Sequence, residues 1–143
     1  MKKILMFSLA VFTFCSAFAL NVNEKVLQAF NKTFSGATEV SWQEYDTHYT
    51  VNFVKDGIRG KVHYALNGEM KQAIRYYEGG KLPLNIQNVL SSTYPKRTIH
   101  GVTEICKGTS TSYYIMMYDT KFWYNLKVEP EGSVALVDRF RKA

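Results

Sequence analysis

The stretch "YTVNFVKDGIRGKVHYALNG", residues 49–68, decides the fold because it holds two strand patterns and two turn signals. Apolar or aromatic side chains alternate with polar ones along it, which is typical of strands with one buried face. The alternating positions are Tyr49, Val51, Phe53, Val62 and Tyr64. Asp56-Gly57 and Asn67-Gly68 are strong signals for hairpin turns. The stretch therefore predicts antiparallel strands joined by tight hairpins.

Two other segments have helical periodicity, "NVNEKVLQAFNKTFSG" (21–36) and "LPLNIQNVLSSTYPKR" (82–97). Asn23 is a candidate N-cap for the first, and Pro95 stops the second. The apolar positions of the two segments coincide at an offset of 60 residues. The coinciding pairs are Val26 with Ile86, Ala29 with Val89, Phe30 with Leu90, and Phe34 with Tyr94.

The strand patterns that follow each helix also coincide, at an offset of 64 residues. The matching positions are Tyr49 with Tyr113, Val51 with Ile115, Phe53 with Met117, Val62 with Leu126, and Tyr64 with Val128. This self-similarity predicts a duplicated unit. We expect an α+β fold of two tandem helix-plus-antiparallel-strand repeats, residues 20–80 and 81–143, forming one compact domain. The helices would pack on one face of the sheet, and "EGGKLP" (78–83) would link the repeats.

The first nineteen residues predict export from a bacterial cell. Lys2-Lys3 precede an apolar run that ends at Ala17-Phe18-Ala19, the pattern of a signal peptide cleaved near Ala19. The run is shorter than the roughly 20 apolar residues that span a bilayer. We therefore expect a periplasmic or secreted protein without stable membrane insertion after cleavage.

Charge and cysteine content narrow the class of partner. The formal charge of +6 includes Lys2 and Lys3, which leaves +4 on the mature chain. The basic residues are mostly scattered, whereas a nucleic-acid-binding protein concentrates them on one face, so no nucleic-acid partner is expected. Cleavage also removes Cys15, so Cys106 is expected to be a single buried thiol.

His63 is interpreted as an ordinary strand residue on a solvated face. Lysine occupies the equivalent position in the second repeat, Lys127, and a functional histidine normally needs an orienting partner. The sequence also lacks HExxH, CxxC, GxSxG, SxxK and phosphate-loop spacing. A nucleophilic Cys106 with His100 is the remaining catalytic alternative. We expect no enzyme activity, no cofactor and no metal site.

Aromatic content, 15% of residues with ten tyrosines, points to binding instead. Both faces of the strand at 113–118 are apolar, and one of them must be available for something other than the core. The candidate binding residues are Tyr77, Tyr114, Met116, Tyr118 and Trp123. Tyr, Trp and Met are enriched in interaction surfaces. The alternative is that this face is covered by the first repeat or by a homodimer.

The order of the motifs resembles the PepSY-like family, also described as beta-lactamase-inhibitor-like exported bacterial proteins. The motifs that carry the resemblance are "EVSW", "YTVNFVKDG", "VHYALNGEM", "YYIMMY" and "LKVEPEG". The resemblance covers essentially the whole mature chain and implies an exported protein of two tandem units. It brings no catalytic residues.

Two functions follow as expectations. The first is a non-enzymatic binding module, an inhibitor or regulator of a hydrolase, that engages a protein or peptide of the cell envelope through the aromatic sheet face. The second is a periplasmic small-ligand carrier with an aromatic-lined pocket between sheet and helix.

Overall fold

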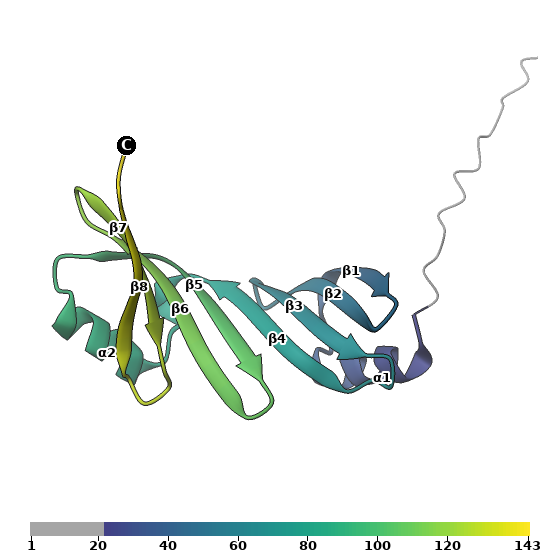
Figure 1. Ribbon diagram of the computed structural model, residues 1–143. Coiled ribbons are helices and arrows are strands. Elements are labelled where there is room, and N and C mark those ends of the chain that lie inside the picture. Colours follow the sequence, from purple (N-terminus) through teal and green to yellow (C-terminus); the bar gives the residue numbers. More distant parts are fainter. Residues whose placement is uncertain (1–21) are drawn as a thin grey trace, which may run out of the picture.

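The computed structural model describes residues 22–143, so the predicted signal peptide lies outside the described residues. Two helices, a short 3-10 turn and eight strands follow one another along this part of the chain (Figure 1). In chain order they are α1 (Glu24–Thr33), β1 (Thr38–Tyr45), β2 (His48–Lys55), β3 (Ile58–Ala65), β4 (Met70–Tyr77), η1 (Gly79–Lys81), α2 (Leu84–Thr93), β5 (Thr98–Lys107), β6 (Ser110–Tyr118), β7 (Phe122–Val128) and β8 (Val134–Arg141).

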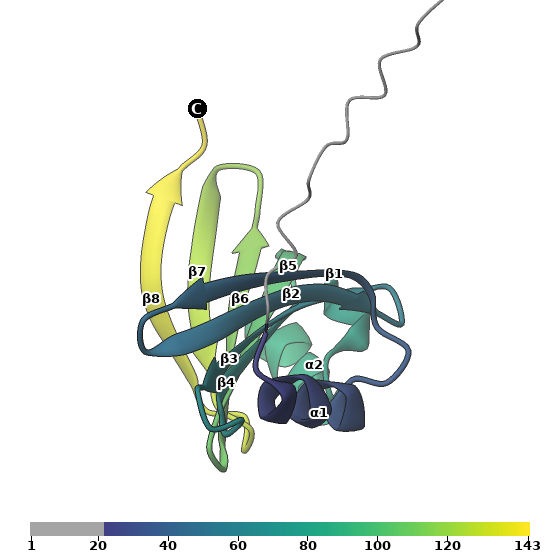
Figure 2. The same cartoon turned by 90° about the vertical axis from the view of Figure 1, so that its right-hand side faces the viewer.

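The strands form one antiparallel sheet in which every strand pairs with its neighbours in sequence, from β1 to β8. The sheet is strongly twisted, so that β1 and β2 run across the direction of β7 and β8 in Figure 2. The predicted α+β fold of two tandem helix-plus-strand repeats, with helices packed on the sheet, was wrong. The described residues are mostly one eight-stranded sheet with only two short helices.

The error has a physical cause at the predicted linker. β4 and β5, on either side of residues 78–83, pair with each other from Ala73↔Cys106 to Tyr77↔Val102. Periodicity in a sequence indicates which residues form strands, but it does not indicate which strands exchange hydrogen bonds. The pairing of β4 with β5 makes a single sheet where two units were expected.

The hairpin turns were predicted correctly. Asp56 and Gly57 both have positive φ, 52° and 71°, as a two-residue type I′ turn requires. Gly68, at φ 90°, is needed for a second reason: a side chain there would lie 2.9 Å from the backbone oxygen of Lys25 in α1. The second hairpin therefore approaches α1 too closely for any residue but glycine.

Each helix is short and contributes two buried side chains. The Asn23 side chain caps α1 by accepting a hydrogen bond from the Lys25 backbone N–H at 2.9 Å. α1 buries Val26 and Phe30, and α2, which follows Pro83, buries Ile86 and Leu90. No helix within residues 22–143 is long and apolar enough to cross a membrane.

Two hydrophobic clusters lie on one side of the sheet, which we call the core face. The N-terminal core cluster consists of Val22, Val26, Phe30, Tyr49, Val51, Phe53, Val62 and Tyr64. The C-terminal core cluster consists of Leu82, Ile86, Leu90, Val102, Tyr113, Ile115, Met117, Tyr124, Leu126 and Val128. The opposite side of the sheet carries neither cluster, and we call it the open face.

A candidate binding surface on the open face of the sheet

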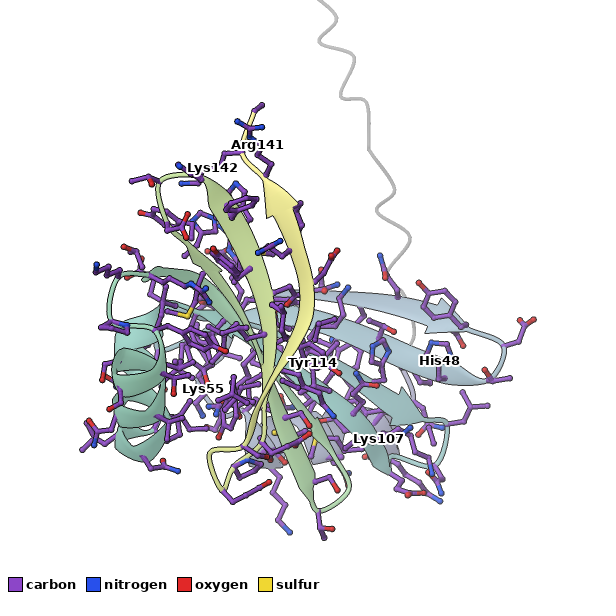
Figure 3. The ribbon with its side chains drawn as sticks, turned by 60° about the vertical axis from the view of Figure 1, so that its left-hand side comes forward. His48, Lys55, Lys107, Tyr114, Arg141 and Lys142 are labelled. Carbon is purple, nitrogen blue, oxygen red and sulfur yellow. The ribbon has the colours of Figure 1, made fainter. Side chains whose placement is uncertain are left out.

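β6 separates its side chains cleanly between the two faces. Tyr113, Ile115 and Met117 are buried in the C-terminal core cluster, and the residues that alternate with them are half-buried on the open face. These half-buried residues are Tyr114, Met116 and Tyr118. Trp123 of β7 pairs directly with Tyr118 and joins them. Four of the five predicted site residues thus share the open face of the C-terminal half, and Tyr114 lies near the middle of the molecule in Figure 3.

The aromatic rings at the end of β6 contact one another. The Tyr118 and Trp123 ring centroids are 5.2 Å apart, and His100 packs edge-on against Trp123 at 5.0 Å. The ammonium group of Lys142 lies 4.1 Å from the Tyr118 centroid and 5.1 Å from that of Trp123. Such contacts hold the rings in fixed positions, so a partner would meet an ordered surface.

A shallow hollow of about 470 Å³ opens beside these rings. Its floor includes Gly101, at a bulge where the pairing of β5 with β6 shifts register. A Cβ added to Gly101 would meet no atom within 4 Å, so the missing side chain leaves real space. Tyr76, Tyr114 and Met116 are among the residues around the hollow. The open face therefore offers both projecting rings and a depression between them.

The fifth predicted site residue, Tyr77, is not brought together with the other four. It borders the hollow, but its ring packs against the C-terminal core cluster and its hydroxyl donates to Glu104 Oε2. Its neighbour Tyr76 is 41% exposed. A bulge in the β3–β4 pairing near Met70 shifts the alternation of β4 by one residue, and such a slip exchanges the two faces.

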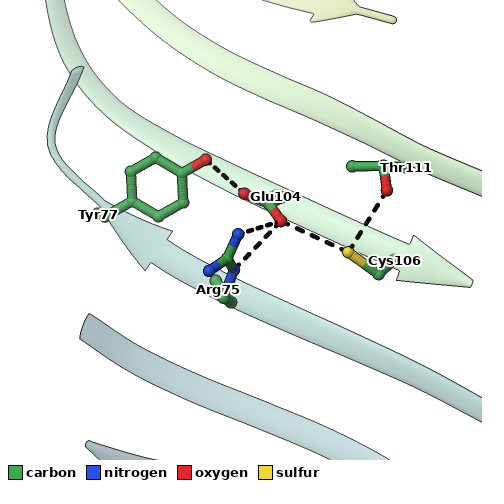
Figure 4. A network of polar contacts seen from close by, with 5 residues as sticks. All are labelled: Arg75, Tyr77, Glu104, Cys106 and Thr111. Carbon is green, nitrogen blue, oxygen red and sulfur yellow. Dashed lines mark hydrogen bonds and ion pairs between the residues drawn. The ribbon is translucent and has the colours of Figure 1, made fainter. Parts of the chain in front are cut away.

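A polar network on the core face holds Tyr77 in place (Figure 4). Glu104 is only 4% exposed and accepts hydrogen bonds from Tyr77, from the Arg75 guanidinium and from the Cys106 thiol. Burial alone would raise the pKa of the Glu104 carboxyl, but the bonds from Tyr77 and Arg75 outweigh it and lower that pKa. Burial, reinforced by Glu104, raises the pKa of the Tyr77 hydroxyl. The carboxylate is therefore charged, and its network joins β4 to β5.

Cys106 is half-buried, where a fully buried thiol was expected. Its polar neighbours are Glu104 Oε1 at 3.4 Å and Thr111 Oγ1 at 3.6 Å. Burial and the adjacent carboxylate raise the pKa of the thiol, which disfavours the thiolate that a nucleophile needs. The geometry around Cys106 supports a role in the network and gives no support to catalysis.

The histidine in the opening stretch has partners that its sequence context did not reveal. His63 Nδ1 lies 2.9 Å from the Thr50 hydroxyl, and the His48 ring lies beside it at 5.8 Å between centroids. Thr50 is only 3% exposed, although it lies on the same face as His63. Burial, helped by His48 and Lys61, lowers the pKa of His63. His48 and Thr50 lie on β2, fifteen and thirteen residues before His63 in the sequence. The residue pattern within β3 alone could not reveal these contacts.

A second hollow lies between α2, η1 and β5 and has a volume of about 540 Å³. Its walls include Glu78, Gln87, Ser91 and Arg97, and no Phe, Tyr or Trp. This hollow is therefore not lined by aromatic rings, whereas a smaller hollow of about 210 Å³ beside the end of α1 includes Phe34 and Phe53 in its lining.

Comparison with solved structures places this fold among known ones. A BLIP-like protein from Bacteroides fragilis superimposes with a TM-score of 0.65 at 17% identity, over 85% of this chain and 87% of that one. The chain has the fold of BLIP-like proteins. A DUF2874 family protein from Bacteroides uniformis matches with a TM-score of 0.62 at 16% identity, covering 83% of this chain and 88% of its own.

A third structure, from Bacteroides eggerthii and described provisionally as a periplasmic protein, matches with a TM-score of 0.63 at 16% identity. It covers 84% of this chain and 88% of its own. No protein-family model matches the chain, and no curated protein matches it. At these identities the similarity extends to the fold alone, and the resemblance to the PepSY-like family stays a prediction.

Proposed function

We propose that this chain is a non-enzymatic exported binding module that engages a protein or peptide of the cell envelope through the open face of its C-terminal half. The observation that carries the proposal is the set of half-buried Tyr114, Met116, Tyr118 and Trp123 side chains on the open face, of which Tyr114 and Met116 border the Gly101 hollow. Rings of this kind, clustered on a surface and fixed by mutual contacts, are the usual anchors of protein interfaces.

The fold supports the same proposal. The side chains stand on strands β6 and β7 in the interior of a continuous sheet, and a scaffold of this kind holds a contact surface rigid before a partner arrives. The BLIP-like fold makes inhibition or regulation of a hydrolase the favoured form of binding. We also propose that the chain belongs to the PepSY-like family, as the sequence motifs suggest. We propose further that residues 1–19 direct its export.

The hollow gives the binding mode a specific form. A protruding apolar or aromatic side chain of the partner would enter the depression over Gly101, while Tyr114 and Met116 contact it from the sides. Desolvated pockets surrounded by aromatic rings are where interfaces gain most of their affinity, about 2 kcal/mol or more per anchor residue.

The test is affinity capture from an envelope fraction with the immobilised chain, followed by mass spectrometry of the bound proteins. We expect a partner recovered by the wild type to be lost by the Tyr114→Ala, Tyr118→Ala, Trp123→Ala triple variant. The matched control replaces three open-face residues of the N-terminal half, Asn52, Lys61 and Gln72, by alanine. That control should recover the same partner.

A single substitution separates binding from folding. Gly101→Val narrows the hollow, and its Cβ would meet no other atom within 4 Å, so the variant should unfold at nearly the wild-type temperature yet bind at least tenfold more weakly. Equal recovery by the triple variant, or undiminished binding by Gly101→Val, would show that this face is not the binding surface.

A further inference from the structure

Two histidines lie together on the open face of the N-terminal half, far in sequence from Tyr114, Tyr118 and Trp123. His48 begins β2 and His63 lies on β3, and their ring centroids are 5.8 Å apart. Register pairs Thr50 with His63 and His48 with Ala65, so the two histidines are diagonal neighbours on one face of adjacent strands.

Each of these rings is held in a defined orientation. His48 Nδ1 lies 3.1 Å from the Thr47 hydroxyl and His63 Nδ1 lies 2.9 Å from the Thr50 hydroxyl. The Tyr45 ring also stacks on His48, with 4.5 Å between centroids and 7° between planes. In the tautomer that donates Nδ1–H to the threonine oxygen, Nε2 carries the lone pair, which is the arrangement found at metal ligands.

The spacing of the rings suits one shared ion. A ligating nitrogen lies about 2.0–2.1 Å from zinc, which puts each ring centroid about 3 Å from the metal. Two rings on one ion therefore have centroids about 5–6 Å apart, depending on the angle at the metal. The observed separation falls within that interval.

We propose that His48 and His63 form a two-histidine site for a divalent transition-metal ion. Imidazole ligands favour copper, zinc and nickel, and Cu²⁺ should bind most tightly of the three. Residues 22–143 contain no group of three or more His, Cys, Asp or Glu side chains placed to hold a metal, so water would complete the coordination. Lys61, whose charge acts on His63, weakens the site and makes its affinity moderate.

The site does not depend on the proposed function, because it uses other residues on the opposite half of the sheet. Its open coordination positions make the bound ion exchangeable, unlike a closed structural site. Mg²⁺ and Ca²⁺, which require several oxygen ligands, should not bind there.

Isothermal titration of the untagged chain with Cu²⁺, Zn²⁺ and Mg²⁺ tests the proposal. We expect one Cu²⁺ per chain, weaker binding of Zn²⁺, and none of Mg²⁺. His48→Ala and His63→Ala should each weaken Cu²⁺ binding at least tenfold. The matched control is His100→Ala, since the ring neighbours of His100 are Tyr118 and Trp123 and it should leave the titration unchanged.

Thr50→Val adds a readout of ring orientation, because it removes the hydroxyl beside His63 while keeping the shape of a β-branched residue. We expect a tenfold to hundredfold loss of Cu²⁺ affinity, with the far-ultraviolet circular dichroism of the wild type. The proposal is overturned if Cu²⁺ does not bind, if His48→Ala and His63→Ala bind as tightly as the wild type, or if His100→Ala weakens binding as much as they do.

Discussion

The two halves of the sheet differ in how many aromatic rings they present on the open face. In the N-terminal half most rings lie inside, where Phe30 packs edge-on against Trp42 and Phe53 at 5.3 and 5.2 Å, and Phe34 packs on Phe53 at 4.6 Å. In the C-terminal half the core cluster is mostly aliphatic, and Tyr114, Tyr118 and Trp123 lie on the open face.

This difference distinguishes rings that pack in the core from rings that are proposed to bind a partner. The aromatic rings of the N-terminal half fill space under α1, and the open face above them is polar, with residues such as Asn52, Lys61 and Gln72. The C-terminal half fills its core mainly with Leu, Ile, Val and Met, together with Tyr113 and Tyr124, and still presents rings outside. The outer rings lie outside both core clusters, and contact with another molecule is the role we propose for them.

The largest expected effect is on the free energy of unfolding, when one buried ring of the N-terminal half and one open-face ring of the C-terminal half are each replaced by alanine. Phe30→Ala empties a buried position, 3% exposed, and should cost about 3–5 kcal/mol of unfolding free energy. Trp123→Ala removes a larger but half-buried ring and should cost about 1 kcal/mol or less. Urea denaturation of both variants measures the two values.

The contrast between the two halves fails if Trp123→Ala lowers the free energy of unfolding as much as Phe30→Ala does. A Trp123→Ala variant as unstable as Phe30→Ala would mean that the outer rings belong to a second core, and their proposed role in binding would lose its support.

A smaller effect is expected at the polar network where the two halves meet. Glu104→Gln removes the charge that accepts bonds from Tyr77 and Arg75, and should cost about 1–3 kcal/mol. The lower part of that range is favoured because the Arg75 side chain is 48% exposed and can regain water. The matched control is Glu69→Gln, whose ion pair with Lys71 is exposed, and it should change stability by no more than about 0.5 kcal/mol.

The effect of Glu104 depends on pH with a definite sign. The folded protein holds the pKa of Glu104 below the value of about 4.3 expected in the unfolded chain. Its stabilising contribution is therefore complete above pH 4.3 and is lost as pH falls through the lower, folded pKa. The stability gap between wild type and Glu104→Gln should narrow below pH 4. A gap of constant size from pH 7 to pH 3 would exclude the charge as its source.

Local features of the fold could be predicted from the sequence. Both helices, the Asp56-Gly57 turn and the alternation of β6 follow from short-range patterns that act within a few residues. The continuity of the sheet could not be predicted, because it depends on hydrogen bonds between β4 and β5 across residues 78–83. Matching patterns in the two halves suggested two tandem repeats within one domain, and nothing in those patterns specifies how the edges of the repeats meet.

The site was predictable to the same extent. Strict alternation placed Tyr114, Met116, Tyr118 and Trp123 on one face, since no bulge interrupts the β6–β7 pairing. Tyr77 lies on the core face instead, because a bulge in β4 exchanges the faces of the residues that follow it. The hollow over Gly101 was also missed, and a glycine inside a strand was the signal that could have indicated it.

The most direct test of the account is hydroxyl-radical footprinting of the chain, free and in the presence of the captured envelope partner. The account predicts protection of Tyr114, Tyr118 and Trp123 on binding, with Tyr45, an exposed ring of the N-terminal half, labelled equally in both states. Protection confined to the N-terminal half, or equal labelling of the three C-terminal rings with and without the partner, would contradict it.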